Sequence, residues 1–215
     1  MPVAYFVSGN SVQGEKIKSL LLYVLENLNS VGFLPKAIVC DQGTNNRNAF
    51  TSLGINSKTP FFYYKNHKIF GLYDVPHLFK NIRNNLLQDN FTLFGNVISF
   101  NYIKKVFHID QSSNTARALP KLSEKHINPN CFEKMSCKLA LQVLSHTVAA
   151  AIRTCVKNGQ IDAAGIHTAN FLEEINNLFD TLNSKRLYSK NPYSCGVSEK
   201  NPLIFETFRK GINIF

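Results

Sequence analysis

A short apolar run, Ala37-Ile38-Val39-Cys40, ends at the polar string Asp41-Gln42-Gly43-Thr44-Asn45-Asn46-Arg47. The run has the length and the branched side chains of a buried strand. Ahead of it, apolar side chains recur at helical spacing from Ile17 to Val31, and Gly32 and Pro35 then end that helix. A helix followed by a strand with a carboxylate at its exit is typical of an α/β fold, in which functional groups collect at the carboxyl ends of strands.

Further strands and helices are predicted around this segment. Val3–Val7 is β-branched and aromatic, which predicts a buried strand, and a helix is expected from the polar string to Leu53. Phe61–Tyr64 and Lys68–Leu72 flank Asn66-His67 and predict a hairpin. Residues 1–75 therefore alternate between strands and helices.

The remainder of the chain, residues 76–215, is predicted to be mostly helical. Val97–Phe107 fits a strand or a helix equally well. Asn130 and Glu133 have the spacing of a helix cap, and one long apolar helix is expected from there to about Val156. A second apolar stripe covers Phe171–Leu182, and the polar tail from Ser184 is expected to form loops. We place a domain boundary near residue 75.

The composition excludes several classes of protein. The chain has 215 residues, of which 44% are hydrophobic and 18% charged, so collagen, coiled coils and wholly disordered chains are excluded. The formal net charge is +10, and residues 58–138 hold 12 basic and 5 acidic side chains. A basic middle third indicates contact with the phosphates of a nucleic acid or nucleotide, although a solvated lysine-rich surface explains it equally well.

The sequence shows no pattern for a zinc site, a membrane span or a secretion signal. Its five cysteines are scattered without metal-ligand spacing and are predicted to be reduced and mostly buried: Cys40, Cys131, Cys137, Cys155 and Cys195. No run approaches the roughly 18 consecutive apolar residues that a membrane span needs, and no signal peptide is visible. We therefore expect an intracellular protein with no membrane partner.

Several long strings carry a resemblance to a known family. They are the polar string 41–47 with Cys40 before it, Phe70-Gly71-Leu72-Tyr73-Asp74-Val75-Pro76-His77-Leu78, Lys80-Asn81-Ile82-Arg83-Asn84-Asn85 and Lys121-Leu122-Ser123-Glu124-Lys125-His126-Ile127-Asn128. Lys138-Leu139-Ala140 and Leu144-Ser145-His146 extend them. Together they resemble the P-element transposases, including their THAP-domain relatives, over nearly the whole chain.

The resemblance implies an RNase H-like, retroviral-integrase-like catalytic domain split by a helical GTP-binding insertion. Residues 1–75 would be part of the catalytic domain, and residues 76–215 the insertion. Asp41 would be the second of three catalytic acids and a ligand of Mg²⁺, since two divalent ions stabilise the attacking and leaving oxygens of strand transfer. The other two acids would lie outside this sequence, as would the cysteine and histidine pattern of a THAP module. We expect no strand transfer from this chain alone.

The resemblance also implies a GTP site without a P-loop, whose sequence pattern is missing. Asp180 and Asn183 would read the guanine edge, Phe179 would stack on the base and Lys121 would face phosphate. Cys137 would contact the nucleotide through its backbone. From the residues alone, Asp180 accepting from guanine N1 and N2 and a solvated helix end are both open.

The expected partners are GTP and, in the intact protein, the DNA of transposon ends, with a nuclear location. Two alternatives remain: a domesticated, non-catalytic interaction protein, and a basic nucleic-acid-binding module that uses residues 58–138. An incomplete sheet would expose an edge and an apolar face, so we also expect poor solubility or homo-oligomers.

Overall fold

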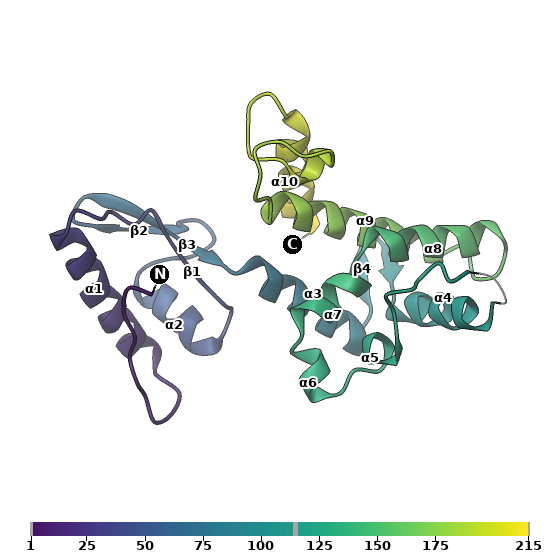
Figure 1. Cartoon of the computed structure of the whole chain (residues 1–215), viewed down its shortest axis with the longest axis horizontal. Coiled ribbons are helices and arrows are strands. Elements are labelled where there is room, and N and C mark those ends of the chain that lie inside the picture. The colour runs from purple at the N-terminus through teal and green to yellow at the C-terminus, as the bar shows by residue number, and fades with distance from the viewer. Residues whose placement is uncertain (1, 114–115, 215) are drawn as a thin grey trace. The chain divides into compact units, whose positions relative to one another are not determined.

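The computed structural model describes residues 2–113 and 116–214. It divides into two compact units, residues 1–78 and residues 79–215. The division falls just after Leu78, within a helix and close to the boundary near residue 75 that the sequence predicts. The first unit combines strands with helices and the second is mostly helical, as expected (Figure 1).

The first unit contains a small mixed sheet. Its elements are α1 (Gly14–Ser30), β1 (Ala37–Cys40), α2 (Thr44–Ser52), β2 (Phe61–Tyr64) and β3 (His67–Tyr73). The strand order is β1-β3-β2, with β1 parallel and β2 antiparallel to β3. The predicted hairpin is confirmed, with its turn at Lys65 and Asn66, which both have the positive φ of a two-residue turn.

Within the described residues of the first unit, helices cover one face of this sheet. Helices α1 and α2 lie against it (Figure 1), and their apolar side chains form a core with those of the strands: Leu25, Phe50, Ile55, Phe62 and Ile69. Successive side chains of a strand point to opposite faces. The strand residues that alternate with Phe62 and Ile69 therefore project from the face of the sheet opposite the helices. Val39, Tyr63, Phe70 and Leu72 are exposed there, and we call these four the bare face.

The predicted strand at Val3–Val7 is wrong. Residues 2–7 are outside any strand, and Tyr5 is 88% exposed. A strand is stable only when a neighbour satisfies its backbone groups and its side chains are buried. The described sheet pairs β1, β3 and β2 with one another and gives this segment no partner.

The second unit begins with most of α3 (Val75–Gln88) and a small antiparallel hairpin of β4 (Phe91–Leu93) and β5 (Asn96–Ile98). The helices that follow are α4 (Phe100–Ser112), α5 (Glu124–Ile127), α6 (Cys131–Lys134), α7 (Cys137–Val143), α8 (His146–Lys157) and α9 (Gly165–Leu182). A short 3-10 turn, η1 (Pro192–Ser194), and α10 (Pro202–Ile214) complete it.

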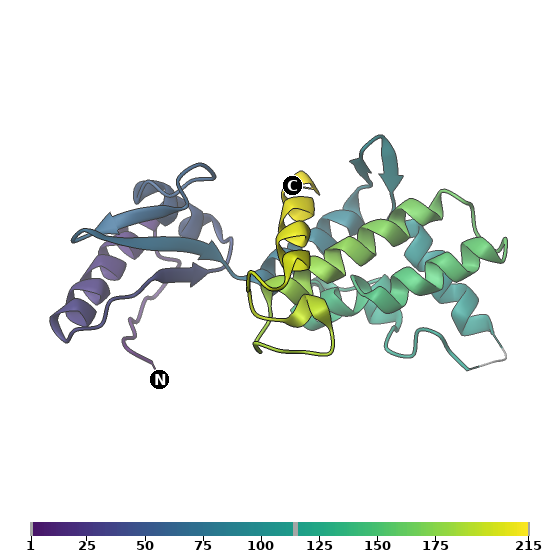
Figure 2. The same ribbon diagram turned by 90° about the horizontal axis from the view of Figure 1, so that it is seen from above.

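The core of this unit lies around α8 and α9, which run side by side in both views (Figures 1 and 2). Helix α4 packs on α8 and α10 packs on α9. The central side chains are fully or almost fully buried: Ile103, Phe107, Val148, Ile152, Leu172 and Ile175. Part of this core comes from residues 137–157, the described segment whose length and hydropathy would suit a membrane span.

The single long helix expected from Asn130 to Val156 is wrong, because serine residues divide it. The predicted cap is present, since Asn130 and Glu133 bond to each other's backbone N–H at the start of α6. Ser136 and Ser145 then accept from the N–H groups of Leu139 and Val148 and so begin α7 and α8. Serine side chains that satisfy the first N–H groups favour new helix starts over continuation.

Two other expectations are corrected. The tail from Ser184 is not loops alone, because α10 buries Ile204, Thr207 and Gly211 along one side. The ambiguous Val97–Phe107 segment divides between β5 and α4, where Ser99 caps the helix. The cysteines are all free as expected, but only Cys155 is buried, and Cys131 is exposed.

Candidate functional site

Asp41 follows β1 directly, at the carboxyl end of that strand. Its Oδ1 accepts from the Gly43 N–H and from Asn46 Nδ2, both at 2.8 Å. A Cβ on Gly43 would lie 2.9 Å from Asp41 Oδ1, so glycine allows this close turn. The polar string therefore fixes its own carboxylate at the edge of the sheet.

A second carboxylate, that of Asp74, lies at the same edge of the sheet, directly after β3. Parallel β1 and β3 pair Cys40 with Tyr73, so Asp41 and Asp74 leave neighbouring strands side by side. The N–H of Asp74 donates to the Cys40 carbonyl at 2.7 Å, and its Oδ2 lies 2.6 Å from His77 Nδ1. Burial raises the pKa of the Cys40 thiol to about 11, and the charge of Asp41 adds to this shift.

This edge does not by itself assemble a metal site. Among the described residues, no group of three or more histidine, cysteine, aspartate or glutamate side chains is close enough to hold an ion. Two-metal chemistry needs such a cluster. The residues present therefore do not fit a complete Mg²⁺ site, and Asp41 as a catalytic acid stays a prediction.

In the helical unit, Asp180 and Asn183 lie at the end of α9 and share one hollow of about 360 Å³. Two cations, Lys185 and Arg186, line the same hollow, together with Ser184, Ser189 and Ser194. Asp180 Oδ2 accepts from Asn191 Nδ2 at 2.8 Å and from Asn176 Nδ2 at 3.3 Å. Among the described residues, none donates to Asp180 Oδ1, which leaves one carboxylate oxygen available to a ligand.

Lys121 lies in a larger hollow of about 660 Å³, together with two more cations, Arg117 and Lys138. Buried groups fix its walls. Asp110 accepts from Arg117 Nε at 3.0 Å and from the N–H of Ala118 at 2.6 Å. Because it carries three cations, this hollow suits an anionic group such as phosphate.

His126 fixes the position of Gln142, a side chain that lines the Lys121 hollow. Its Nδ1 accepts from the Ser123 N–H at 3.0 Å, so Nε2 carries the proton and donates to Gln142 Oε1 at 2.9 Å. Gln142 lies on α7 beside Leu141 and faces the hollow. This buried histidine thus holds α7 against the loop that carries Lys121.

A short hydrogen-bond relay links Asp180 of the first hollow to the start of α8, beside the Lys121 hollow. Asn176 donates to Asp180, and its Oδ1 accepts from the His146 N–H at 3.2 Å. Ser145 and Thr147, the neighbours of His146 in sequence, line the Lys121 hollow. The relay therefore connects the carboxylate at the end of α9 with the start of α8, beside the cationic hollow.

Cys137 and Phe179 lie in neither hollow. Cys137 is the first residue of α7, directly before Lys138 of the Lys121 hollow, and Phe179 directly precedes Asp180. The Phe179 ring packs edge-on against Phe79, with ring centroids 5.1 Å apart. Each is adjacent in sequence to a residue that lines a hollow, and their contacts with a nucleotide stay predictions.

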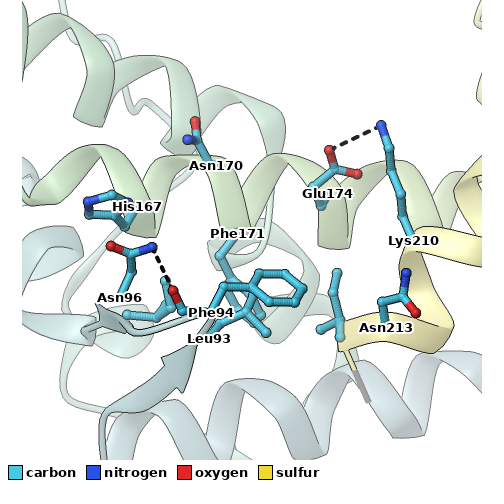
Figure 3. A pocket seen from close by; sticks show the side chains of 11 residues that line it. Leu93, Phe94, Asn96, His167, Asn170, Phe171, Glu174, Lys210 and Asn213 are labelled. Atoms are coloured by element: carbon cyan, nitrogen blue, oxygen red, sulfur yellow. Dashed lines mark hydrogen bonds and ion pairs between the residues drawn. The ribbon is translucent and has the colours of Figure 1, made fainter.

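A third hollow, of about 340 Å³, contains none of the predicted residues. It lies between the β4–β5 hairpin, α9 and α10, with Phe94 and Phe171 among its apolar side chains and the Glu174–Lys210 ion pair at one end (Figure 3). Its other polar groups are Asn96, His167, Asn170 and Asn213. It is separate from the two hollows described above.

Sequence reasoning missed several residues of this arrangement. Asn176 could have been predicted from its spacing, since it lies one helical turn before Asp180. Nothing in the sequence marks Asn191. The side chain of His146 is exposed, and its Nε2 lies 3.2 Å from Glu173 Oε1.

Comparison with known proteins gives consistent matches. The family models described as "TNP-like, RNase H N-terminal domain" and "TNP-like, GTP-binding insertion domain" match residues 1–54 and 76–195. The transposable element P transposase of Drosophila melanogaster is 35% identical over 175 residues, which are 80% of this chain and 23% of that protein. The solved Drosophila P element transposase strand transfer complex is 29% identical, with a TM-score of 0.84 over 95% of this chain and 46% of that one.

These matches confirm the predicted fold classes of both parts, a partial RNase H-like domain and a helical GTP-binding insertion domain. The chain spans less than a quarter of the curated relative and less than half of the solved one.

Proposed function

The chain belongs to the TNP-like transposase family, that of the P-element transposases, and we propose that its helical unit binds GTP across the two hollows. The hydrogen-bond relay through Asn176 supports this most directly. It links a carboxylate with one open oxygen to the start of α8, beside a hollow that holds three cations. A guanine nucleotide has the complementary pattern, with paired N–H donors at one end and phosphates at the other.

The base would be read at the end of α9. Asp180 Oδ1 accepts from guanine N1–H or N2–H, while Asn176 and Asn191 hold the other oxygen in place. Adenine presents an acceptor at N1, which a carboxylate repels. Asn183 lines the same hollow and Phe179 precedes Asp180, so both can assist in holding the base.

The phosphates would lie toward the Lys121 hollow, where Lys121 and Lys138 carry charges that no carboxylate of the described residues neutralises by an ion pair. Arg117 is paired with Asp110 and acts mainly by shaping the loop. Cys137, at the start of α7, is adjacent to Lys138, and its backbone is the proposed further contact. Without a P-loop, GTP serves here as a bound cofactor of assembly.

Calorimetric titration with GTP and ATP tests this proposal. The unaltered chain should bind GTP and reject ATP, and Asp180→Asn should weaken GTP binding at least about tenfold, since an unmatched polar group in a specific site is costly. Asp89→Asn makes the same chemical change at an exposed aspartate of the same unit and should leave binding unchanged. A folded chain that binds no GTP, or that binds ATP equally well, would overturn the proposal.

For the intact protein we propose transposition of DNA by Mg²⁺-dependent strand transfer, in the nucleus and as an oligomer. Asp41 would supply one carboxylate of the metal site, and acids outside this sequence would supply the others. The relative's solved complex is a strand transfer complex, which supports DNA as the partner of the intact protein. We expect no membrane partner.

A second function is favoured by the same cations. The Lys121 hollow could bind the phosphate backbone of nucleic acid without regard to sequence. In that case DNA affinity would fall steeply with salt and GTP would not compete for it. Competition by GTP would favour the nucleotide site.

A further inference from the structure

Arg83 of α3 is a fully buried arginine without a carboxylate partner among the described residues. Its Nε donates to Asn84 Oδ1 at 2.8 Å, and its Nη2 donates to the Glu133 and Lys134 carbonyls at 3.4 and 3.2 Å. Its Nη1 is buried and has no hydrogen-bond partner among these residues. A buried charge without an opposite charge is costly, so this group calls for an explanation.

The contacts of Arg83 place it behind the turn that leads into α7. Glu133 and Lys134 are the last residues of α6, and Cys137 begins α7 three residues later. Burial lowers the pKa of the Arg83 guanidinium, and the nearby Cys137 thiol acts against this shift. Asn84 Nδ2 donates to the Lys134 carbonyl as well, at 3.1 Å, so α3 holds this turn at two points.

Helix α3, which carries Arg83, also contacts α9 beside Asp180, at the base end of the candidate site. Phe79 is one helical turn before Arg83, so both lie on one side of α3, and Phe79 packs against Phe179 beside Asp180. Thr181, only 4% exposed, has the other buried side-chain atom without a partner among the described residues, its Oγ1. The two unsatisfied atoms therefore come from the two helices that meet at the Phe79–Phe179 contact.

We propose that Arg83 is a positioning residue whose buried charge attracts the phosphates of the bound nucleotide and holds the α6–α7 turn in place for them. This inference rests on the GTP-binding function proposed above. Arg83 has no exposed surface and so does not touch the ligand. It acts through Cys137 and Lys138, which the turn presents beside the Lys121 hollow.

The physical basis is the weak screening of a buried charge. Between surface charges water removes most of an interaction, whereas a charge surrounded by protein acts over a longer distance. The nucleotide's phosphates would supply the negative charge that the described residues do not. The base end of the nucleotide carries no charge, so Arg83 should affect GTP and guanosine differently.

The test compares GTP with guanosine on the whole chain. Arg83→Gln removes the charge and keeps an amide donor for the two carbonyls, while Arg83→Lys keeps the charge. We expect Arg83→Gln to weaken GTP binding at least about tenfold relative to guanosine, and Arg83→Lys to recover most of that loss. Arg153→Gln removes an equal charge from a partly exposed site on α8 and should leave the ratio unchanged.

A role in stability alone would weaken GTP and guanosine binding equally, and that result would overturn the inference, as would an unchanged ratio in folded Arg83→Gln. If that variant does not fold, nitrogen-15 spectra of the unaltered chain decide. GTP should shift the Arg83 guanidinium signals and guanosine should not; equal shifts or none would overturn the inference. If the unaltered chain binds guanosine and GTP equally, a base site is present but the role of Arg83 is overturned. If it binds neither, the proposed function itself is overturned.

Discussion

The two units differ in how completely they bury their apolar side chains. In the first, α1 and α2 cover one face of the sheet, and on the bare face Val39 remains 59% exposed. In the second, α8 and α9 bury Ile152 and Leu172 completely. The helical unit has an enclosed core of its own, whereas the side chains of the bare face are exposed among the described residues of the first unit.

This difference extends to the candidate sites. Asp41 is exposed and is fixed by contacts within its own turn. In the helical unit, the buried groups Asp110 and His126 hold the loops around the candidate nucleotide site. Buried polar groups with satisfied partners rigidify their surroundings. We therefore expect the helical unit to keep a binding geometry alone, while Asp41 needs further structure to act.

The largest effect should come from opening the helical core. Ile152→Ala should reduce the free energy of unfolding by about 3 kcal/mol, through lost burial and the cavity left behind. Val39→Ala on the bare face should change it by less than about 0.5 kcal/mol. Urea unfolding followed by circular dichroism measures both, and equal losses would show that the two units do not differ in burial as described.

Part of this contrast could be read from the sequence. The stripe Phe171–Leu182 and the run Ala37–Cys40 predict α9 and β1 because local periodicity decides them. The breaks at Ser136 and Ser145 could not be predicted with assurance, since a serine within an apolar stretch either caps a helix or is tolerated inside one, and tertiary packing decides.

Long-range contacts limit prediction of the site in the same way. The resemblance to the family predicts Asp41, Asp180 and Asn183 as site residues, and their roles stay predictions. The relay through Asn176 and His146 joins residues 30 positions apart, and the carbonyls that Arg83 holds are 50 and 51 positions away. No local pattern encodes such pairs, so the buried cation became visible only in the fold.

In the first unit, the covered face of the sheet should tolerate no added volume. A Cβ on Gly71 of β3 would lie 2.7 Å from Ile55 Cδ1 and 3.1 Å from Phe50 Cε2. Gly71→Ala should therefore cost about 2 kcal/mol by overpacking. Gly9→Ala meets nothing within 4 Å and serves as the control. If thermal unfolding gave the two variants equal stability, the packing of α2 on the sheet would be looser than the structure shows.

The bare face should promote self-association. Val39→Lys should weaken association by roughly tenfold, since buried apolar surface contributes about 25 cal/mol per Å² and a lysine opposes its burial. Val197→Lys changes an equally exposed valine in the helical unit and should have no effect. Sedimentation velocity over a range of concentrations measures this, and a purely monomeric unaltered chain would contradict it.

The smallest effect concerns acid pH. Arg153, and then His146, lower the pKa of Glu173 on α9 below its ordinary 4.5. A carboxyl with a lowered folded-state pKa adds stability above its unfolded pKa and loses it as pH falls through the folded value. The contribution should stay below about 1 kcal/mol because the pair is partly exposed. Glu173→Gln should reduce the pH dependence of unfolding below pH 5, whereas Glu199→Gln, at an exposed site, should not.

The effect of salt on these carboxylates should differ between the two units. Glu26 of the first unit also has a lowered pKa, through hydrogen bonds from Lys65 and Tyr64, but its side chain is exposed. Surface charges are screened within about 3 Å at 1 M salt. High salt should therefore remove the effect of Glu26→Gln on the pH dependence and leave part of the effect of Glu173→Gln. Equal suppression of both would mean that the ion pair of Glu173 on α9 is as solvated as the pair between Glu26 of α1 and Lys65 of the β2–β3 turn. Burial would then distinguish the two units in their apolar cores alone.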